Sequence, residues 1–488
     1  MHVMSFNSLH FWIFCAVACS LYYVAPHRYR WVCLLAASYY FYASFSPGIL
    51  IVLVGLTAFV YLVTRLMQRS GSPTRRRVLL LADIGGPLLA LIVFKYLDLM
   101  WHAVQYLAAV VRQRGPLEHL NILAPIGISF YVFKLLSYAL DVYHRRAEAE
   151  THPGYFALWV AYFPQILAGP IERAGHLLPQ FRQRVSFDPE AVLAGARLVA
   201  WGLFKKMVVA DRLAYYVGEV FLVPQGKGLH LLFGAYFYYF QIYCDFSGYS
   251  DISVGISRIL GLSSPQNFDY PYLSRSVSQF WTRWHITLSS WLRDYLFLPI
   301  TYAVMRRIPE DRRWGIKAES WGYAVGMSVT MVLGGLWHGA ALTFVVWGAL
   351  HGVFLVASYA GRTARRRLCR LTRLNRLPRV HHALSILVTF HLITLAWIVF
   401  RATSFENLTT YIRYMQFRLP LAGTVNLLLD TCIVLVLLGF EYVQRHQADL
   451  VFLRRVPIEV KAVGYALFVV VLIALSVDSN NAFIYFRF

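Results

Sequence analysis

Charged residues are scarce in this chain, and acidic ones are the scarcest. Asp, Glu, Lys and Arg make up 14% of the 488 residues, with 24 acidic against 46 basic side chains, whereas 58% of the residues are hydrophobic. No Ser-, Pro- or Gly-rich linker and no stretch of soluble composition separates the apolar segments. The positive charge therefore has no soluble domain on which to form a nucleic-acid groove, and we expect no nucleic acid among the partners.

Other patterns are absent as well. Long apolar-polar alternation is missing, which argues against a transmembrane barrel. The chain contains no GxSxG nucleophile elbow, no P-loop and no dinucleotide fingerprint. The cysteines show no CxxC or Cys/His spacing suited to zinc, so we expect no metal site, no bound cofactor, and buried, inert thiols at Cys15, Cys19, Cys33, Cys244, Cys369 and Cys432.

What remains is a succession of apolar segments with a mean hydropathy of +0.52. At about 20 residues per span, the sequence predicts an all-α polytopic membrane protein. We expect about eleven to thirteen helices, some of them re-entrant or interfacial, in one transmembrane domain over residues 1–488. The first apolar stretch, residues 11–24, has no Lys or Arg before it, which favours an uncleaved first helix over a signal peptide.

Basic residues gather in short loops, and the densest cluster is the eight arginines within residues 362–379. The positive-inside rule places such loops in the cytoplasm, beside anionic membrane lipid. Residues 306–317 and 362–379 enclose enough apolar residues for an out-and-back pair of helices with His338 near its turn. A single broken helix is the alternative, and it would place His338 nearer the membrane midplane.

His338 lies in the apolar run of residues 334–348. Ionisable groups in hydrocarbon are costly and often mark functional sites. An apolar site favours the neutral imidazole, which can accept a proton at neutral pH. Acting as a general base, His338 could activate a hydroxyl toward a thioester without a covalent enzyme intermediate. The alternative is a core histidine hydrogen-bonded to a neighbouring helix.

Two further polar segments stand out. Residues 280–299 are too charged to cross lipid alone and predict an interfacial helix with an inward aromatic face, although an aromatic anchor with His285 at headgroup level fits the spacing too. Asp245 and Asp251 favour a polar lining or the cap of a helix break at Gly248 over a metal site. Residues 162–173 predict a loop or a broken helix.

Several motifs together resemble the membrane-bound O-acyltransferase (MBOAT) family, in particular its bacterial branch similar to the alginate O-acetylase membrane subunit. They occur in order along nearly the whole chain, namely at residues 4–8, 125–131, 163–173, 245–251, 281–295, 337–339 and 483–488. The resemblance implies a helical membrane fold around a central tunnel. It also implies that His338 and His285 are catalytic, and with it we predict substrate-binding roles for Trp337, Asp245, Arg283 and Asp294.

The resemblance further implies an O-acetyltransferase of the inner membrane. Its acyl donor would be cytoplasmic acetyl-CoA, used as a substrate, and its product would be an acetylated exopolysaccharide of the alginate or cellulose type. The expected partners are an exopolysaccharide biosynthesis and export complex and a periplasmic acetyltransferase of the Ser-His-Asp type. Transfer of a D-alanyl or longer acyl group to teichoic acid, lipid or protein is the alternative within the enzyme class.

Two readings from other classes are weaker. A polysaccharide transporter would show matched broken helices in two repeated halves, and we find no such internal pairing. A catalytically degenerate export scaffold would have lost the histidines, yet both His285 and His338 are present.

Overall fold

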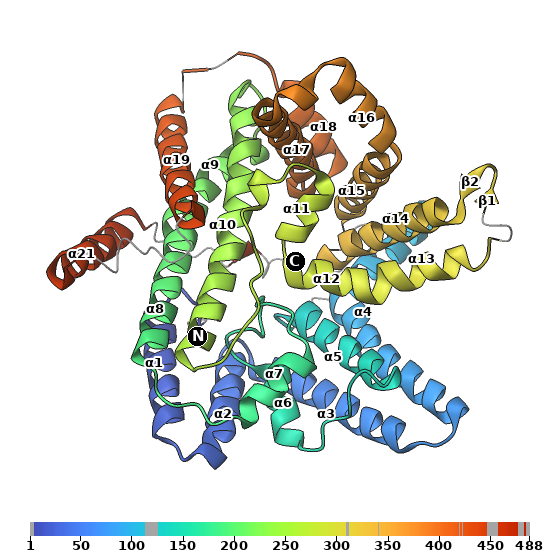
Figure 1. The fold of residues 1–488 in the computed structure, drawn as a ribbon, viewed down its shortest axis with the longest axis vertical. Coiled ribbons are helices and arrows are strands. Elements are labelled where there is room, and N and C mark those ends of the chain that lie inside the picture. The colour runs from blue at the N-terminus through green and yellow to red at the C-terminus, as the bar shows by residue number, and fades with distance from the viewer. Residues whose placement is uncertain are drawn as a thin grey trace. The chain divides into compact units, whose positions relative to one another are not determined.

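The structure is a computed structural model that describes residues 4–112, 125–308, 312–339, 341–418, 420–421, 423–446, 457–476 and 483–484. Its regular structure is almost entirely helical (Figure 1), which confirms the predicted all-α class. The first three residues, and the last four residues of the family-like C-terminal motif, lie outside the described part.

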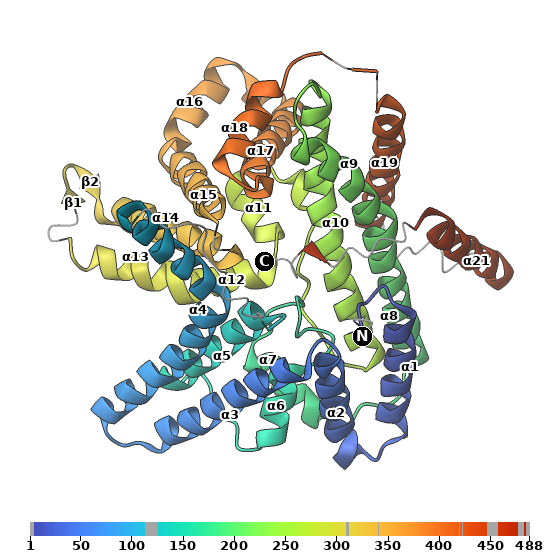
Figure 2. The ribbon, with the colours of Figure 1, turned by 180° about the vertical axis from the view of Figure 1, so that it is seen from behind.

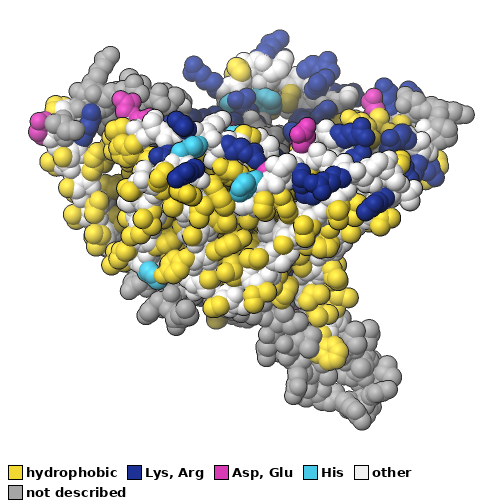
Figure 3. Space-filling model, turned by 90° about the horizontal axis from the view of Figure 1, so that it is seen from below, with side chains coloured by type: hydrophobic (Ala, Val, Ile, Leu, Met, Phe, Trp, Pro, Cys, Tyr) yellow, Lys and Arg dark blue, Asp and Glu magenta, His cyan; other side chains and the backbone are white. Residues whose placement is uncertain are grey.

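Within the described residues, five helices are long and apolar enough to cross a membrane. They are α3 (Pro47–Arg69), the first 25 residues of α4 (Pro73–Arg112), α15 (Leu342–Ala360), α17 (Pro378–Arg401) and α19 (Thr424–His446). Hydrophobic side chains lie openly on the surface (Figure 3), as lipid-facing helices require. The apolar segments at residues 78–95 and 97–111 are both parts of the single helix α4, which contains Pro87.

The described chain forms two compact units, and the first contains residues up to 199 together with 250–266. In it, α3, α4 and α5 lie side by side (Figures 1 and 2). Its other helices are α1 (Leu9–Val24), η1 (His27–Tyr29), α2 (Arg30–Ala43), α5 (Ile128–Tyr143), α6 (Pro153–Ala161), α7 (Ala174–Arg182) and most of α8 (Pro189–Leu203). The predicted single domain over residues 1–488 stays a prediction.

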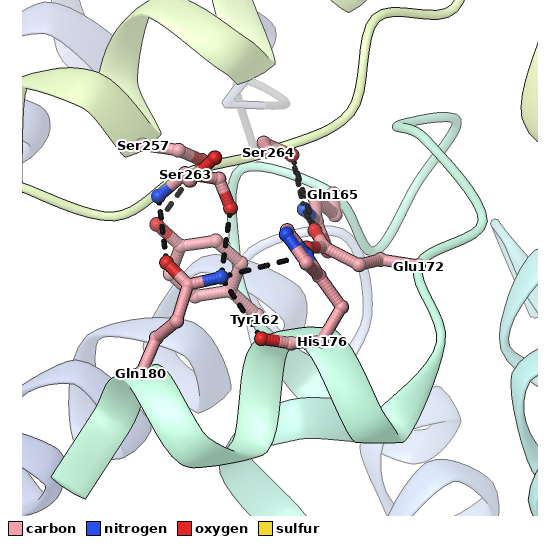
Figure 4. A network of polar contacts seen from close by, with 8 residues as sticks. All are labelled: Tyr162, Gln165, Glu172, His176, Gln180, Ser257, Ser263 and Ser264. Carbon is pink, nitrogen blue, oxygen red and sulfur yellow. Dashed lines mark hydrogen bonds and ion pairs between the residues drawn. The ribbon is translucent and has the colours of Figure 1, made fainter.

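Residues 162–173, between α6 and α7, are not helical, as the sequence predicted. Glu172 is buried there and accepts hydrogen bonds from Gln165 and from Ser264, the latter at 3.1 Å, and it also contacts His176 (Figure 4). Gln180 on α7 completes the network through the backbone nitrogen of Ser263, which donates to its amide oxygen at 2.7 Å. These bonds hold the loop to residues 263–264 and favour a structural role for this motif.

The second unit contains residues 200–249 and 267–487. Beside α15, α17 and α19 it includes, in chain order, η2 (Phe204–Ala210), α9 (Asp211–Leu222), α10 (His230–Ile259, whose last turns belong to the first unit), η3 (Pro271–Leu273), α11 (Val277–Arg283), α12 (Ile286–Leu292), η4 (Arg293–Phe297), α13 (Leu298–Met305), β1 (Arg312–Arg313), β2 (Ile316–Lys317), α14 (Ala318–His338), α16 (Arg362–Leu371), η6 (Leu374–Arg376), α18 (Phe405–Tyr414) and α21 (Ile458–Leu475). Strands β1 and β2 pair antiparallel through a two-residue turn in which Trp314 and Gly315 both have positive φ.

Helices α14 and α15 form the predicted out-and-back pair and pack along each other. Two glycines allow the close approach. A Cβ atom added at Gly335 would lie 2.2 Å from the carbonyl oxygen of Phe344, and one at Gly348 would lie 2.2 Å from that of Met331. Small residues that let backbones meet are characteristic of helix pairs in membranes. The alternative of one broken helix is therefore wrong.

Two other expectations are wrong. Helix α10 runs unbroken past Gly248, where a Cβ atom would lie 2.7 Å from the carbonyl oxygen of Gly202, so this glycine serves helix packing and not a break. The thiols are all free among the described residues, but only those of Cys15 and Cys244 are buried, and Cys432 is exposed.

Candidate active site

His338 is the last residue of α14, and its side chain is buried. Its imidazole meets three aromatic rings edge to face: Trp337 at 4.9 Å between ring centroids, Trp347 of α15 at 5.1 Å and Phe400 of α17 at 5.1 Å. The next residue, Gly339, packs closely against α15, since a Cβ atom there would lie 2.4 Å from the ring of Phe344. Three helices thus hold this imidazole within aromatic walls.

His285 lies in the break between α11 and α12 and is fully buried. Its backbone has a φ of 42°, a left-handed conformation that side chains other than glycine rarely adopt and that clusters at functional sites. The predicted single helix over residues 280–299 is therefore wrong, because the chain turns here and continues through π-helical η4. Its aromatic face does point inward at Trp284 and Trp291, which are buried.

The Asn267 side chain holds this turn together. Its Oδ1 atom lies 3.1 Å from Nδ1 of His285, and it accepts hydrogen bonds from the backbone nitrogen of Thr287 at 3.2 Å and from its hydroxyl at 2.9 Å. An oxygen that accepts from Thr287 also accepts from the His285 ring, so the Nδ1 atom of His285 carries the proton. In the neutral ring this leaves the lone pair on Nε2.

Burial keeps the His285 ring neutral. It lies outside the five candidate spans, and desolvation lowers the pKa of its imidazole from 6.5 to about 3. His285 is therefore uncharged at physiological pH.

The two predicted catalytic histidines meet at Trp337. Its indole lies 4.9 Å from the ring of His338 and 6.4 Å from that of His285, measured between centroids. Phe246 of α10 covers His285 from another side, at 4.6 Å. The structure thus brings together three of the six predicted site residues, His285, Trp337 and His338, although they come from separate segments of the chain.

A third buried histidine, His351 of α15, escaped the sequence analysis. Its Nδ1 atom accepts a hydrogen bond of 3.2 Å from Nε1 of Trp281, and its ring lies 4.8 Å from that of Trp347. Trp347 contacts both His351 and His338, so the two imidazoles share one indole wall. The signal was available, because His351 is a histidine inside an apolar span, the same pattern that singled out His338.

A pocket of about 300 Å³ borders this region. Ile286, which follows His285 in the sequence, lines this pocket together with Trp281 and Thr282. The pocket wall is rich in hydroxyl groups. Its hydroxyl-bearing residues are Ser278, Thr282, Ser289, Ser290 and Thr330. Such a wall offers both donors and acceptors to a polar substrate.

Asp245, predicted to bind substrate, is buried within an ion-pair network. Nζ of Lys206 lies 2.8 Å from its carboxylate and 2.7 Å from that of Asp211. The other carboxylate oxygen of Asp245 accepts a hydrogen bond of 2.8 Å from the backbone nitrogen of Ile484, near the C-terminus. These bonds join α10, η2, α9 and the chain end, which is a structural task, and the substrate role stays a prediction.

The other two predicted substrate-binding residues, Arg283 and Asp294, each form an ion pair. Arg283 lies 3.5 Å from the carboxylate of Asp269, and Asp294 accepts a 2.9 Å bond from Arg293. Their roles toward a substrate also stay predictions. Within the described part, no group of three or more His, Cys, Asp or Glu side chains is placed to hold a metal ion.

Known proteins resemble this chain in sequence. The sequence model of MBOAT, the membrane-bound O-acyltransferase family, matches residues 34–308. The chain is 35% identical to the probable alginate O-acetylase AlgI of Pseudomonas aeruginosa over 82% of its own length and 72% of that protein. It is 30% identical to the peptidoglycan O-acetyltransferase of Helicobacter pylori over 77% and 71% of the two chains.

A more distant relative is the teichoic acid D-alanyltransferase of Bacillus subtilis, which is 26% identical over 59% of this chain and 71% of its own. Together with the five apolar helices, the matches identify an acyltransferase that crosses the bacterial inner membrane several times. This chain belongs to the membrane-bound O-acyltransferase family.

Proposed function

We propose that this protein transfers acetyl groups from cytoplasmic acetyl-CoA toward the hydroxyl groups of a secreted exopolysaccharide, with His338 as the general base. The observation that carries the proposal is the pair of buried histidines, His338 and His285, that both lie next to Trp337 in an acyltransferase. The names of the relatives support acetyl as the acyl group, since five of them are probable alginate O-acetylases and one is a peptidoglycan O-acetyltransferase.

In the proposed reaction, the imidazole of His338 removes the proton from the acceptor hydroxyl while the oxygen attacks the thioester carbonyl. The carbon-oxygen bond forms, the carbon-sulfur bond breaks, and the proton passes from His338 to the departing CoA thiolate. The negative end of the α14 dipole lies at this histidine and stabilises the imidazolium that forms between these steps. Nothing else needs activation, because a thioester is already a reactive acyl donor.

The aromatic walls around His338 support this reaction. Trp337, Trp347 and Phe400 exclude bulk water from the imidazole, which strengthens electrostatic interactions within the site. His285 presents its Nε2 lone pair from a rigid turn and can accept a hydrogen bond from a substrate group. We propose that His285 orients the acceptor and that His338 carries the proton.

A periplasmic partner of the Ser-His-Asp type completes the proposed pathway. It would accept the acetyl group on the far side of the membrane and place it on sugar hydroxyls, within a complex that makes and exports the polymer. Alginate-like and cellulose-like polymers both offer suitable secondary or primary hydroxyls. The peptidoglycan relative makes a cell-wall glycan the main competing acceptor.

The experiment measures the O-acetyl content of each surface polysaccharide and of peptidoglycan in the native host. It compares wild type with His338→Ala and with His391→Ala, which removes an exposed histidine of α17, at matched membrane expression. Loss of a general base lowers the rate by about 10²–10⁴-fold, so we expect acetyl to disappear from one polymer in His338→Ala only. Unchanged acetylation of every polymer would refute the assignment, and loss from peptidoglycan alone would replace the acceptor.

A further inference from the structure

A pocket of about 840 Å³ lies in the second unit, outside the histidine site. It is formed where α15 ends, α16 and η6 follow, and α17 begins, with the residues before α11 closing one side. Its wall is mainly apolar, with Val277, Phe354, Leu384, Val388 and Leu392 among its residues. The pocket therefore combines a hydrophobic interior with the polar groups of the 362–379 loop region.

The polar groups of this pocket are cationic or uncharged. Arg275, Arg365, His381 and His382 line it together with Asn375, and none of its described lining residues is acidic. The sequence reinforces this bias, because residues 320–405 contain no Asp or Glu at all. An anion entering the pocket would meet two guanidinium groups and no carboxylate from its walls.

The position of the pocket along the helices fixes its depth in a bilayer. Helix α15 is one candidate span and ends at Ala360, and α17 is another and begins at Pro378, so the pocket lies at the membrane surface shared by those two ends. Between them, α16 carries a strongly basic face together with Leu368 and Leu371, whose side chains are exposed. Basic amphipathic helices of this kind lie in the headgroup region.

We propose that this pocket binds the headgroup of an anionic phospholipid of the cytoplasmic leaflet. The phosphate would pair with Arg275 and Arg365, the hydroxyls of Ser276 and Ser358 and the amide of Asn375 would take further headgroup oxygens, and an acyl chain would follow the apolar wall. Guanidinium groups suit phosphate because they donate two parallel hydrogen bonds. The assignment does not depend on the proposed acetyl transfer.

A lipid bound in the pocket would affect the histidine site through α15. Phe354 lines the pocket and its ring lies 6.2 Å from that of His351, one turn earlier on the helix. His351 in turn contacts Trp347, which contacts His338. The lipid would therefore stabilise the end of the helix that carries one wall of the active site.

The test uses the purified full-length protein in detergent after removal of bound lipid. Binding of phosphatidylglycerol, cardiolipin, phosphatidylethanolamine, acetyl-CoA and inorganic phosphate is measured in parallel by thermal shift and by native mass spectrometry. We compare wild type with the double variant Arg275→Gln/Arg365→Gln and with the matched control Arg376→Gln/Arg379→Gln. The control removes two arginines of the same region that do not line the pocket.

Loss of the charged hydrogen bonds from two guanidinium groups to the phosphate costs about 1.4 kcal/mol or more, so the pocket variant should bind phosphatidylglycerol or cardiolipin at least about 10-fold more weakly. The control should change less than about threefold, and phosphatidylethanolamine should bind weakly to all three proteins. Equal losses in both variants would overturn the proposal in favour of diffuse surface attraction. Binding of acetyl-CoA or phosphate that displaces the lipid and depends on Arg275 and Arg365 would reassign the pocket to a soluble phosphate compound.

Single variants guard against misfolding. If Arg275→Gln/Arg365→Gln elutes as an aggregate, the single variants Arg275→Gln and Arg365→Gln each remove one guanidinium group from the pocket. Each should weaken lipid binding by about threefold or more, because one set of charged hydrogen bonds to the phosphate is lost. Undiminished lipid binding by both folded single variants would overturn the proposal.

Discussion

Asp245 shows how a buried carboxylate in an apolar helix can have a structural task and still attract a functional interpretation. The family resemblance led to a predicted role in substrate binding, whereas the residue pattern alone favoured a polar lining or a helix cap. The structure gives both carboxylate oxygens partners, Lys206 on one side and the backbone of Ile484 on the other. A buried charge pair of this kind is strongly destabilised when one partner is removed.

We expect Asp245→Asn to lower the free energy of unfolding by about 2–4 kcal/mol, at the low end of the cost of breaking a buried ion pair because Asp211 still pairs with Lys206. Asp294→Asn, which alters a partly exposed pair with Arg293, should change stability by less than about 1 kcal/mol. Thermal unfolding of both variants in detergent tests this prediction. An unchanged stability with a raised KM for Asp245→Asn would instead establish substrate binding.

His285 gives a prediction about pH. Its pKa is about 3 in the folded protein and 6.5 when exposed, so below pH 6.5 the unfolded chain binds a proton that the folded one does not. The stability that His285 contributes is thus complete above pH 6.5 and is lost as pH falls toward 3. As the pH falls from 7 to 4.5, we expect the free energy of unfolding of wild type to decrease by on the order of 2 kcal/mol more than that of His285→Gln.

The measurement is the melting temperature of both proteins across that range. Parallel curves for His285→Gln and wild type would mean that the His285 ring takes up its proton in the folded state too.

At the scale of elements, the close packing of α14 against α15 positions His338 against Trp347. We expect Gly335→Ala to separate the two helices, to lower stability by about 1–3 kcal/mol through overpacking, and to reduce activity, since misplacement by 1 Å can lower a rate about 100-fold. Gly55→Ala in α3 is the matched control, because a Cβ atom there would meet nothing within 4 Å.

Activity and melting temperature are compared for the two alanine variants. The control should be neutral or slightly stabilising, because alanine reduces the entropy of the unfolded chain. Full activity of Gly335→Ala would show that His338 does not depend on this helix contact.

The helices that the sequence predicted well are those whose ends are marked by charge. The α14 and α15 pair follows from two basic loops that bound an apolar run, and both features are local. The break at His285 could not be predicted, because its positive φ is held by Asn267, which lies 18 residues away. The break predicted at Gly248 is wrong for a similar reason. This glycine packs against Gly202 of another helix, and the local sequence does not show that contact.

For the whole molecule, the positive-inside rule fixes a topology that thiol labelling can test. In a background with the other five cysteines replaced by serine, Cys369 of α16 should react with a membrane-impermeant maleimide only after the inner membrane is opened. Leu342→Cys, at the other end of the α15 span and 61% exposed, should in a cysteine-free background react in intact spheroplasts. Reaction of both from the same side would contradict the out-and-back topology.

Only some of the residues of the candidate site could be predicted from the sequence. His338 and His285 stand out as ionisable groups among apolar neighbours, and Trp337 adjoins one of them. The remaining walls, Phe246, Trp347 and Phe400, are ordinary aromatic residues in apolar helices, and nothing local distinguishes them from lipid-facing ones. Their role follows from the tertiary contacts of α10, α15 and α17 with the two histidines.

In the proposed reaction, the aromatic rings around His338 also affect how much of the thioester is lost to water. A base that activates hydroxyls would activate a water molecule equally well, so the ratio of productive transfer to futile hydrolysis depends on which molecule reaches Nε2 or Nδ1 of the ring. With Trp337, Trp347 and Phe400 around the imidazole, small clusters of water find few polar contacts there. In the proposed reaction, these three rings would thereby limit the hydrolysis of the cell's activated acyl groups.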